Sequence, residues 1–593
     1  MKREDLIPRR TVLGMGVALA GLCAGCAVLP DTEPEADSVA GQRLEKARDV
    51  EINGVHLRDN DELYNVYDDS GVVTMYLTVS RGNDSENTNH SWSEINHYSV
   101  YDYEAMGVAR YQVNAILQVG DENGPAEGEV GYGVEAPNAT VQIRGQTSSE
   151  NIQKSYKIKL KKGKGTWRGQ RTIDLNKHMT EGLRFRNKMA YDLIRGIDQM
   201  MGLRTQFIHL YVKDLTENSS GVFVDYGLYT QVEQLNKTAL QAHGLDKNGQ
   251  LYKVNFFEFY RNEDVIRLTI DPGYDQTAFE QMLEIKGSSD HSKLIEMLDV
   301  LNDESQSMDE VLFRKYFDAE NIAYWMAFQI LTGNTDTQNR NMYLYSPQNS
   351  DKWYLLDWDN DGMLMRKERS FTKFTDGESW ERGVSNYWGS VLFRRCLRTR
   401  SFRELLDTAV NELYADLDKE RITSMVGHYR SVTEPYVWRM PDQMYVPITY
   451  AEYEQVAAGL WTEISENYTD YRESYLKPMP FYIGTPMSDN GQLLIGWDPS
   501  YDFGNEDITY TVELSRNYTF NTVIFRQENI VLPQIQMDLP AAGQYFVRIR
   551  AVNASGYRQD AFDYYVTDEG KHYGIQCFYI EPDGSIVEDT YAE

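Results

Sequence analysis

The sequence predicts an α+β protein in which a β-rich half is followed by a helix-rich half and then by an all-β module. Between about 50 and 260, apolar and polar residues alternate, as in Val72–Val79, which is typical of strands. From about 283 to 475, apolar residues recur at helical spacing, as in Phe402–Leu417. A chain of 593 residues is too long for one hydrophobic core. The first two parts therefore favour a two-lobed domain, β-rich and then helical, with its site in the cleft.

The third part begins after Pro478 and Pro480, where short apolar runs again alternate with polar residues. An early Trp497 and the later run Tyr545–Gly556 resemble a fibronectin type III module, which is an immunoglobulin-like sandwich. We expect Trp497 and Tyr545 to be core residues of that sandwich. The predicted domains are a main domain at 49–476, the module at 477–570 and a tail at 571–593.

Charge and cysteine content exclude several classes of protein. The net charge of −31 repels phosphate backbones, so we expect no nucleic-acid partner. Of the four cysteines, Cys23 and Cys26 lie in the N-terminal apolar stretch, and Cys396 and Cys577 are far apart. Neither a disulfide framework nor a zinc site is visible, and the nine histidines form no metal-binding pattern.

The N-terminus has the composition of an export signal at 1–30, with a basic head, a short apolar run and the small-residue exit Ala24–Cys26. This exit resembles a bacterial lipobox in which Cys26 is lipidated. An acidic linker at 31–48 would tether the folded body outside the cell membrane, which it contacts through the lipid alone. Arg9-Arg10 resembles a twin-arginine signal, and the alternative is a general secretory signal.

The chemically informative residues lie in two neighbouring segments, Asn334–Tyr345 and Trp353–Gly362. Residues 357, 359 and 361 share a parity, so a continuing strand would project their three carboxylates from one face. Oxygen ligands without histidine or cysteine favour a hard cation. The alternative is a hairpin turn with solvated acids at 360–362.

Asp336 and Asn341 are five positions apart, the spacing of the catalytic aspartate and the metal-binding asparagine in the protein-kinase catalytic loop. No His-Arg pair precedes this aspartate. The spacing predicts the functional parts of a kinase site without its usual signature.

Five motifs in order resemble the CotH family, the spore coat protein H-like atypical protein kinases. They cover about residues 135 to 365, and several spaced motifs are more specific than one. The motifs are Arg144–Ser149 with Lys154–Lys157, Arg186–Lys188, Gly227–Glu233, Asn334–Tyr345 and Trp358–Asp361.

The resemblance implies an ATP-dependent phosphotransferase that uses Mg²⁺ or Mn²⁺, with Asp336 orienting the acceptor hydroxyl. Arg186 would be either a phosphate contact or part of a charged helix face. The implied metal ligands are Asn341, Asp359 and Asp361. The implied nucleotide contacts are Lys154, ranked ahead of Lys157, and Arg144 and Glu233.

We therefore expect a surface-anchored kinase for serine or threonine of a secreted or surface protein, beside a module that binds surface protein or carbohydrate. Family members usually have proline or an apolar residue where Asp357 stands, so Asp357 either adds a metal ligand or disturbs the site. The alternatives are a non-catalytic assembly or adhesion scaffold and a small-molecule phosphotransferase.

Overall fold

The computed structural model describes residues 56–217, 221–371, 380–567 and 570–589. The predicted signal at 1–30, with Cys26, and the linker at 31–48 lie outside the described residues. The chain divides into a main unit, Val55–Asp376 with Glu381–Ser474, and a C-terminal unit that includes Tyr475–Glu593. Within the described ranges, no helix is both long and apolar enough to cross a membrane.

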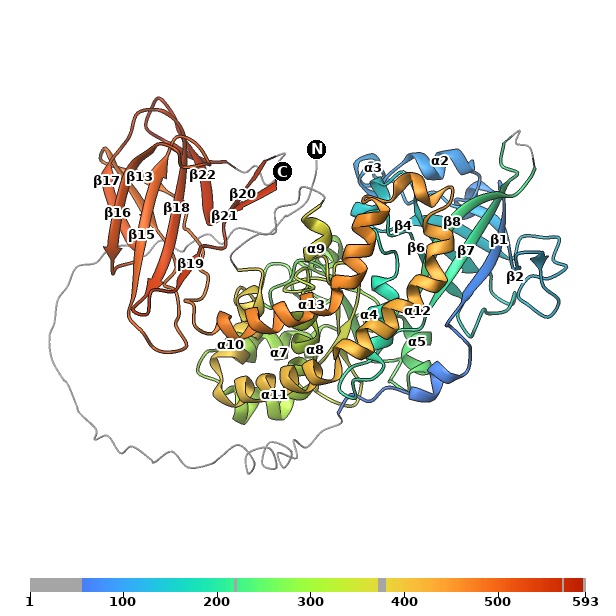
Figure 1. Cartoon of the computed structure of the whole chain (residues 1–593). Coiled ribbons are helices and arrows are strands. Elements are labelled where there is room, and N and C mark those ends of the chain that lie inside the picture. Colours follow the sequence, from blue (N-terminus) through green and yellow to red (C-terminus); the bar gives the residue numbers. More distant parts are fainter. Residues whose placement is uncertain (1–55, 218–220, 372–379, 568–569, 590–593) are drawn as a thin grey trace. The chain divides into compact units, whose positions relative to one another are not determined.

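The first half of the main unit is a sheet of order β1-β7-β8-β6-β5-β4-β2-β3 (Figure 1). Strand β1 pairs in parallel with β7 and antiparallel with β2, so seven of these strands form a closed ring with β3 as an extension. A closed ring leaves few unpaired edges. The strands are β1 (Val72–Ser80), β2 (Val113–Asp121), β3 (Gly124–Pro125), β4 (Ala139–Arg144), β5 (Ser155–Leu160), β6 (Thr172–Asn176), β7 (Thr205–Asp214) and β8 (Val224–Glu233).

Inward-facing residues of this sheet form a continuous apolar core. Leu77, Val141, Ile158 and Leu175 are fully buried in it, because alternate residues of each strand point to the same face. Short helices precede, connect or follow the strands of this sheet. They are η1 (Asp61–Asn65), η2 (Asp84–Glu86), α2 (Trp92–His97), α3 (Val100–Met106), η3 (Thr147–Glu150), α4 (Arg186–Ile194) and α5 (Lys237–Ala242).

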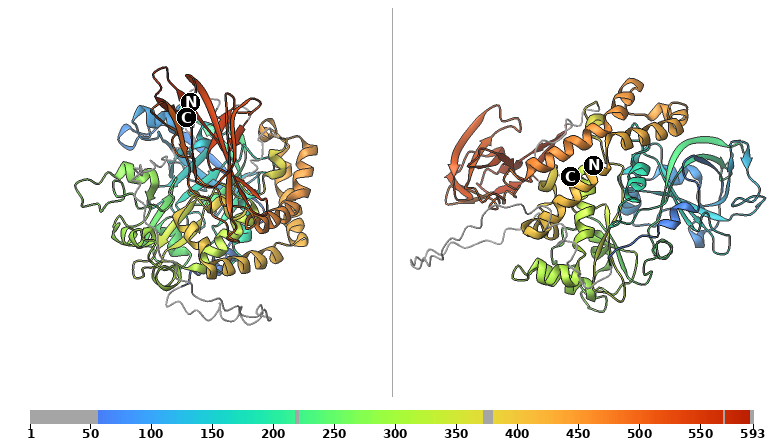
Figure 2. Two further views of the ribbon diagram at one scale, coloured as in Figure 1. Left: turned by 90° about the vertical axis from the view of Figure 1, so that its left-hand side faces the viewer. Right: turned by 60° about the horizontal axis from the view of Figure 1, so that its bottom comes forward.

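The second half of the main unit is helical around a small antiparallel sheet. The sheet has the order β10-β9-β11-β12, from β9 (Gln250–Val254), β10 (Leu283–Ile285), β11 (Met342–Ser346) and β12 (Tyr354–Asp357). The large sheet lies at one end of the unit and α8, α10 and α11 lie at the other, as Figure 1 and the right-hand view of Figure 2 show. The helices are α6 (Gln276–Met282), α7 (Ser292–Asn302), η4 (Met308–Tyr316), α8 (Ala319–Thr332), α9 (Arg366–Arg369), η5 (Gly383–Tyr387), α10 (Val391–Arg398), α11 (Arg400–Asp416), α12 (Lys419–Val437), η6 (Asp442–Tyr445) and α13 (Tyr450–Ser474).

Gly227 of β8 shows why one motif of the sequence requires glycine. Its φ is 79°, in the left-handed region, and an added Cβ would lie 1.9 Å from Oδ2 of Asp442. Asp442 accepts a hydrogen bond from the Leu228 backbone and pairs with the buried Lys177 at 2.7 Å. The glycine therefore lets η6 approach the large sheet.

The C-terminal unit contains only strands in its described part, as predicted for an all-β module. Trp497 and Tyr545 are buried in its core, also as predicted. The assignment to the fibronectin type III type stays a prediction. The sheets run β13-β14-β17, β16-β15-β18-β22-β23 with β19 on β18, and β20-β21, from β13 (Met487–Asp489), β14 (Gln492–Gly496), β15 (Ile508–Ser515), β16 (Val523–Ile530), β17 (Gln534–Asp538), β18 (Gly543–Asn553), β19 (Arg558–Asp560), β20 (Tyr564–Thr567), β21 (Gly570–Tyr573), β22 (Ile575–Ile580) and β23 (Ile586–Glu588).

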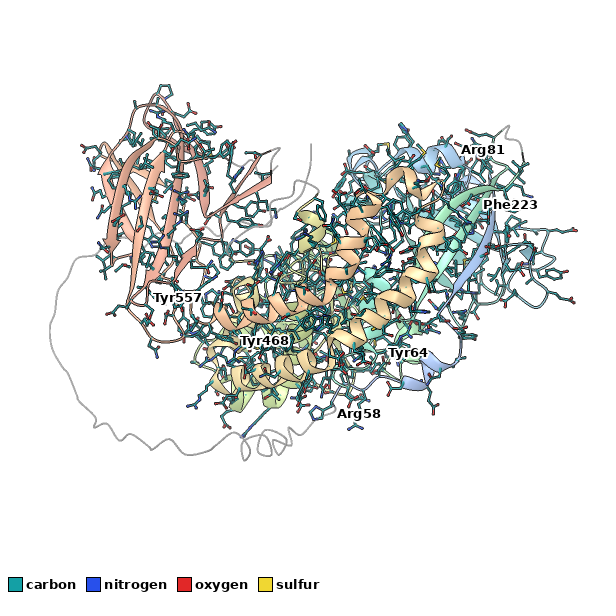
Figure 3. The ribbon with its side chains drawn as sticks, viewed as in Figure 1. Arg58, Tyr64, Arg81, Phe223, Tyr468 and Tyr557 are labelled. Carbon is teal, nitrogen blue, oxygen red and sulfur yellow. The ribbon has the colours of Figure 1, made fainter. Side chains whose placement is uncertain are left out.

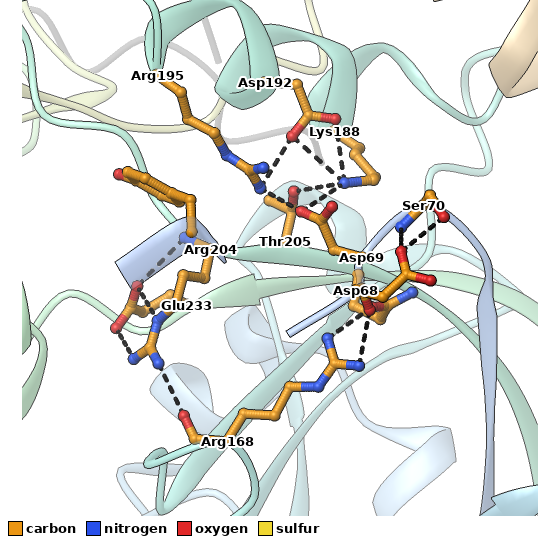
Figure 4. A network of polar contacts seen from close by, with 12 residues as sticks. Asp68, Asp69, Ser70, Arg168, Lys188, Asp192, Arg195, Arg204, Thr205 and Glu233 are labelled. Carbon is orange, nitrogen blue, oxygen red and sulfur yellow. Dashed lines mark hydrogen bonds and ion pairs between the residues drawn. The ribbon is translucent and has the colours of Figure 1, made fainter. Parts of the chain in front are cut away.

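A buried ionic network holds the first described residues onto the main unit (Figure 4). Asp69 pairs with Lys188 at 3.2 Å and with Arg195. Ahead of it, Asp59 contacts His243 at 2.6 Å and accepts a hydrogen bond from Tyr64, which is labelled in Figure 3. The segment that leaves the predicted linker is therefore fixed to the fold by charge.

The predicted nucleotide contact Glu233 belongs to this network. Its carboxylate accepts hydrogen bonds from His243 at 3.0 Å and from Arg204. Burial opposes ionisation of Glu233, but His243 and Arg204 lower its pKa to about 2. Burial likewise opposes protonation of His243, but Asp59 and Glu233 raise its pKa to about 9.

We predict a loss of stability at alkaline pH that depends on His243. Its pKa is raised above the ordinary 6.5, so its contribution is complete below about 6.5 and is lost as pH rises through about 9. His243→Gln should lower the free energy of unfolding by about 3 kcal/mol at pH 7, since it removes the cation between the buried carboxylates of Asp59 and Glu233. It should also remove this alkaline loss.

Thermal unfolding between pH 6 and 10 measures this effect, with exposed His97→Gln as the control. Equal pH profiles for the wild type and His243→Gln would show that the network is not charged as described.

Candidate functional site

The two polar segments singled out in the sequence meet at one end of the small sheet. Strands β11 and β12 are antiparallel, with Met342 opposite Asp357, so Asn341 before β11 and Asp359 after β12 extend from the same end. Both residues lie in the left-handed region, with φ of 56° and 63°. Asparagine and aspartate tolerate that conformation, which is concentrated at functional sites. The structure therefore brings two predicted metal ligands together.

The loop that carries Asp336 is held in place on several sides. The Asn341 side-chain amide donates to Asp336 at 3.2 Å, which leaves the Asn341 amide oxygen as its metal-binding atom. Arg340 also pairs with Asp336, and its guanidinium lies 4.8 Å from the ring centre of Phe256. Asn386 of η5 donates to the Thr335 backbone at 3.0 Å. Asp336 remains 45% exposed in its side chain, so its carboxylate is open to a ligand.

Asp359 and Asp361 form a partly neutralised pair of carboxylates. Burial, and next the charge of Asp361, raise the pKa of Asp359 to about 6, while Lys253 and Arg144 oppose that rise. Nδ1 of the buried His178 lies 3.4 Å from Asp361. Burial raises the pKa of Asp361, but the histidine contact and the charge of Arg144 act together to lower the pKa overall. Repulsion between two adjacent carboxylates is relieved when a cation binds.

Asp357 does not share a face with these two residues, so the predicted three-carboxylate face is wrong. The strand ends at Asp357 and the left-handed Asp359 breaks the alternation. Asp357 is instead 1% exposed and accepts hydrogen bonds from the side-chain amides of Gln329 and Asn360. Asn334 donates to both of these amides, at 3.0 and 3.2 Å. Asp357 is thus the centre of a buried network between the two loops, and not a metal ligand.

A cluster of cations from both sheets lies beside the carboxylates. Burial lowers the pKa of Lys157 on β5, and the neighbouring charges of Arg144, Lys286 and Arg110 lower it further. Burial likewise lowers the pKa of Lys253 on β9, and Arg144 and Lys286 add to that effect. Cations that repel one another in this way favour an anion between them. The acids that partly balance the cluster are Asp174, which lies 3.7 Å from Arg144, and Glu284, which is opposite Lys253 in the pairing of β9 with β10 and forms an ion pair with Lys286.

Two of the predicted nucleotide contacts are not part of this cluster. Lys154 donates to the Ser149 backbone at 2.5 Å and interacts with Asp102 and Glu150, on another side of β5 from Lys157. Glu233 lies in the ionic network around His243. Odd- and even-numbered residues of a strand point to opposite faces of the sheet, which explains why Lys157 and not Lys154 lies near Arg144.

Sequence reasoning did not identify His178, Lys253, Asp174 or Glu284. A weak signal existed for Lys253, because it is the charged residue within the apolar strand Leu251–Val254. His178 carried no motif, and its importance depends on a contact with Asp361 across 183 positions of sequence.

The donor set fits a hard cation. Asn341, Asp359 and Asp361 offer only oxygen atoms, which suits Mg²⁺ or Mn²⁺. Within the described ranges, no three histidine, cysteine, aspartate or glutamate side chains gather as a metal-binding group.

We predict that Asp357→Asn lowers the free energy of unfolding by about 1–3 kcal/mol. Gln329 and Asn360 both donate to the carboxylate, so an asparagine amide nitrogen would face a donor. Urea denaturation gives the value. The exposed Asp351→Asn is a matched control that should change stability by less than about 0.5 kcal/mol. A wild-type midpoint for Asp357→Asn would refute the network.

Comparisons with known proteins place the chain in a family. The comparison with curated proteins found no match. Among solved structures, the chain is similar to the Shewanella oneidensis MR-1 toxin–antitoxin complex of HipA, HipB and operator DNA, with 10% identity and a TM-score of 0.22. That match covers 51% of this chain and 58% of that chain, and at this TM-score it does not identify the fold. The family model described as CotH kinase protein matches residues 141–471, which is more than half of the chain and includes every residue of the site. The protein is therefore a member of the CotH kinase family, as the motifs of its sequence predicted.

Proposed function

We propose that the main unit is an atypical, two-lobed protein kinase that transfers the γ-phosphoryl group of ATP to a serine or threonine of a secreted or surface protein. The observation that carries the proposal is the contact between Asp336 and Asn341 at the same end of the sheet as Asp359 and Asp361. A hydroxyl-orienting carboxylate next to a metal-binding set is the minimal arrangement for phosphoryl transfer.

Asp336 would act on the acceptor. Its exposed carboxylate accepts a hydrogen bond from the acceptor hydroxyl and takes its proton as the oxygen attacks phosphorus. The bond from the γ-phosphorus to the oxygen of ADP breaks as the new ester bond forms. Arg340 and Asn341 fix the orientation of the carboxylate, and fixed orientation is a large part of catalysis in this chemistry.

Lys157, Lys253 and Arg144 would hold the phosphates. They come from strands of the two sheets. Lys253 and Arg144 interact with Asp359, and Lys157 interacts with Arg144, so an anion bound among them would be close to the metal-binding set. Mg²⁺ or Mn²⁺ bound by Asn341, Asp359 and Asp361 would neutralise phosphate charge.

The chain as a whole would be an exported lipoprotein attached through Cys26. The C-terminal unit would contact a surface protein or carbohydrate. Both statements rest on the sequence pattern.

Transfer of radiolabelled phosphate from ATP tests the function. The full-length chain should label a protein acceptor only with Mg²⁺ or Mn²⁺, and Asp336→Asn and Asp359→Ala should each lower kcat by at least about 100-fold. Asp351→Asn is the control and should label as the wild type does. Absence of labelling with every metal, together with absence of ATP binding, would favour the non-catalytic scaffold.

In the same assay, Lys157 in β5 and Lys154 directly before β5 provide a matched pair of variants. Lys157→Met should raise the KM for ATP by about tenfold or more, whereas Lys154→Met should leave it near the wild-type value. The reverse result would contradict the placement of the phosphates. Labelling of a small hydroxyl compound in preference to protein would identify a small-molecule phosphotransferase.

A further inference from the structure

Arg186 is the first residue of α4 and has no role in the proposed chemistry. Its side chain is fully buried, at 0% exposure. It is therefore neither an open phosphate contact nor part of an exposed helix face, which were the two alternatives from the sequence. A buried guanidinium requires charged or carbonyl partners, and these partners indicate what it does.

Two of the three partners of Arg186, Leu364 and Glu368, lie in the segment that follows the proposed metal-binding aspartates, and the third, Glu181, lies in the loop before α4. Nε of Arg186 donates to the Leu364 backbone carbonyl at 3.1 Å, and Nη1 lies 2.7 Å from Glu368 and 3.0 Å from Glu181. Glu368 is also fully buried, and it accepts a hydrogen bond from the Gly182 backbone. The start of α4 and the loop before it therefore bind the chain at Leu364 and Glu368, three and seven residues after Asp361.

Leu364 shows that this grip holds an unfavourable backbone. Its φ is 51°, which is rare for a branched aliphatic residue and costs on the order of 1–3 kcal/mol. Its N–H donates to Thr332 at 2.8 Å, at the end of α8, and its carbonyl accepts from Arg186. Such a backbone conformation persists only where contacts with the surrounding structure hold it in place, as the hydrogen bonds of the Leu364 N–H and carbonyl do.

The same loop reaches Asp361 itself. His178, which lies 3.4 Å from Asp361, has its other ring nitrogen 3.5 Å from the Asn187 amide, next to Arg186 in the sequence. The loop and the start of α4 thus contact the metal segment at Asp361 and again at Leu364 and Glu368. Contacts at separate points along one segment fix its position better than any single contact.

We propose that Arg186 is a positioning residue: with Glu368 it fixes the segment that carries Asp359 and Asp361, and so sets the affinity of the site for its divalent cation without touching that cation. The inference rests on the proposed function for the identity of the metal site. Buried ion pairs contribute little net stability but can contribute specificity of structure, which is the effect that positioning requires. Residues that orient metal ligands typically change affinity by about 10- to 100-fold when replaced.

The test measures Mn²⁺ binding to the full-length chain by electron paramagnetic resonance, which needs no catalysis. Arg186→Lys keeps the charge but loses the Nε bond and the planar fork, and Glu368→Gln keeps the size but loses the charge. Each variant should raise the Kd for Mn²⁺ by about tenfold. The Mg²⁺ concentration for half-maximal transfer should rise by the same factor, with the KM for the acceptor protein unchanged.

Lys188→Gln is the matched control. Lys188 lies in the same helix and is equally buried. Its ammonium group pairs with Asp69 and Asp192, and the hydrogen bonds and ion pairs described for it do not involve residues 359–368. Its loss should lower the melting temperature and leave the Kd for Mn²⁺ unchanged. An equal change in Kd for Lys188→Gln would show a general effect of stability and would overturn the inference.

Two further results would separate the positioning role of Arg186 from the proposed function. A wild-type Kd in both Arg186→Lys and Glu368→Gln, or a wild-type chain that binds no Mn²⁺, would overturn the inference. Weakened Mn²⁺ binding in the variants of a chain that transfers no phosphate would support the positioning role and overturn the proposed function instead.

Discussion

The arrangement of the site depends on one buried carboxylate. Asp357 accepts hydrogen bonds from Gln329 of α8 and from Asn360, and Asn334 donates to both of these residues. Burial raises the pKa of Asp357 to about 7, although the amide contacts oppose that rise. Polar groups without partners are costly in a protein interior, so this set of side chains admits few alternative arrangements. It fixes the loop before β11 against the loop after β12, and every proposed metal ligand lies on one of these two loops.

The remaining parts of the site are then placed by strand geometry. The ends of β11 and β12 bring Asn341 beside Asp359, and the pairing of β9 with β11 places Lys253 opposite Tyr343. The closed ring of the large sheet contributes Arg144 and Lys157 from neighbouring strands. The cations and carboxylates of the site thus span more than 200 residues of the sequence, from Arg144 to Asp361. The site is suited to an anion with a bound divalent cation, because its cationic side chains would attract the anion and its carboxylates would bind the metal ion.

Much of this could be predicted from the sequence, and the errors have physical causes. The alternation of apolar residues predicted the β-rich half, and the spacing of Asp336 and Asn341 singled out two residues whose side chains the structure shows in contact. The parity argument for residue 357 was wrong because the strand ends at Asp357 and the left-handed Asp359 breaks the alternation, and no local sequence pattern indicates that conformation. Lys154 and Glu233 were ranked by their place in motifs, whereas their partners are set by tertiary packing. His178 and Lys253 depend on long-range contacts, which a single sequence does not reveal.

The most direct test of this account is anomalous diffraction at the manganese edge from crystals soaked with Mn²⁺ and a non-hydrolysable ATP analogue. We expect one strong peak bounded by Asn341, Asp359 and Asp361, with phosphate oxygens completing the coordination, and Asp357 still bonded to its two amides. A peak elsewhere on the chain, or a manganese ion bound directly by Asp357, would contradict the account.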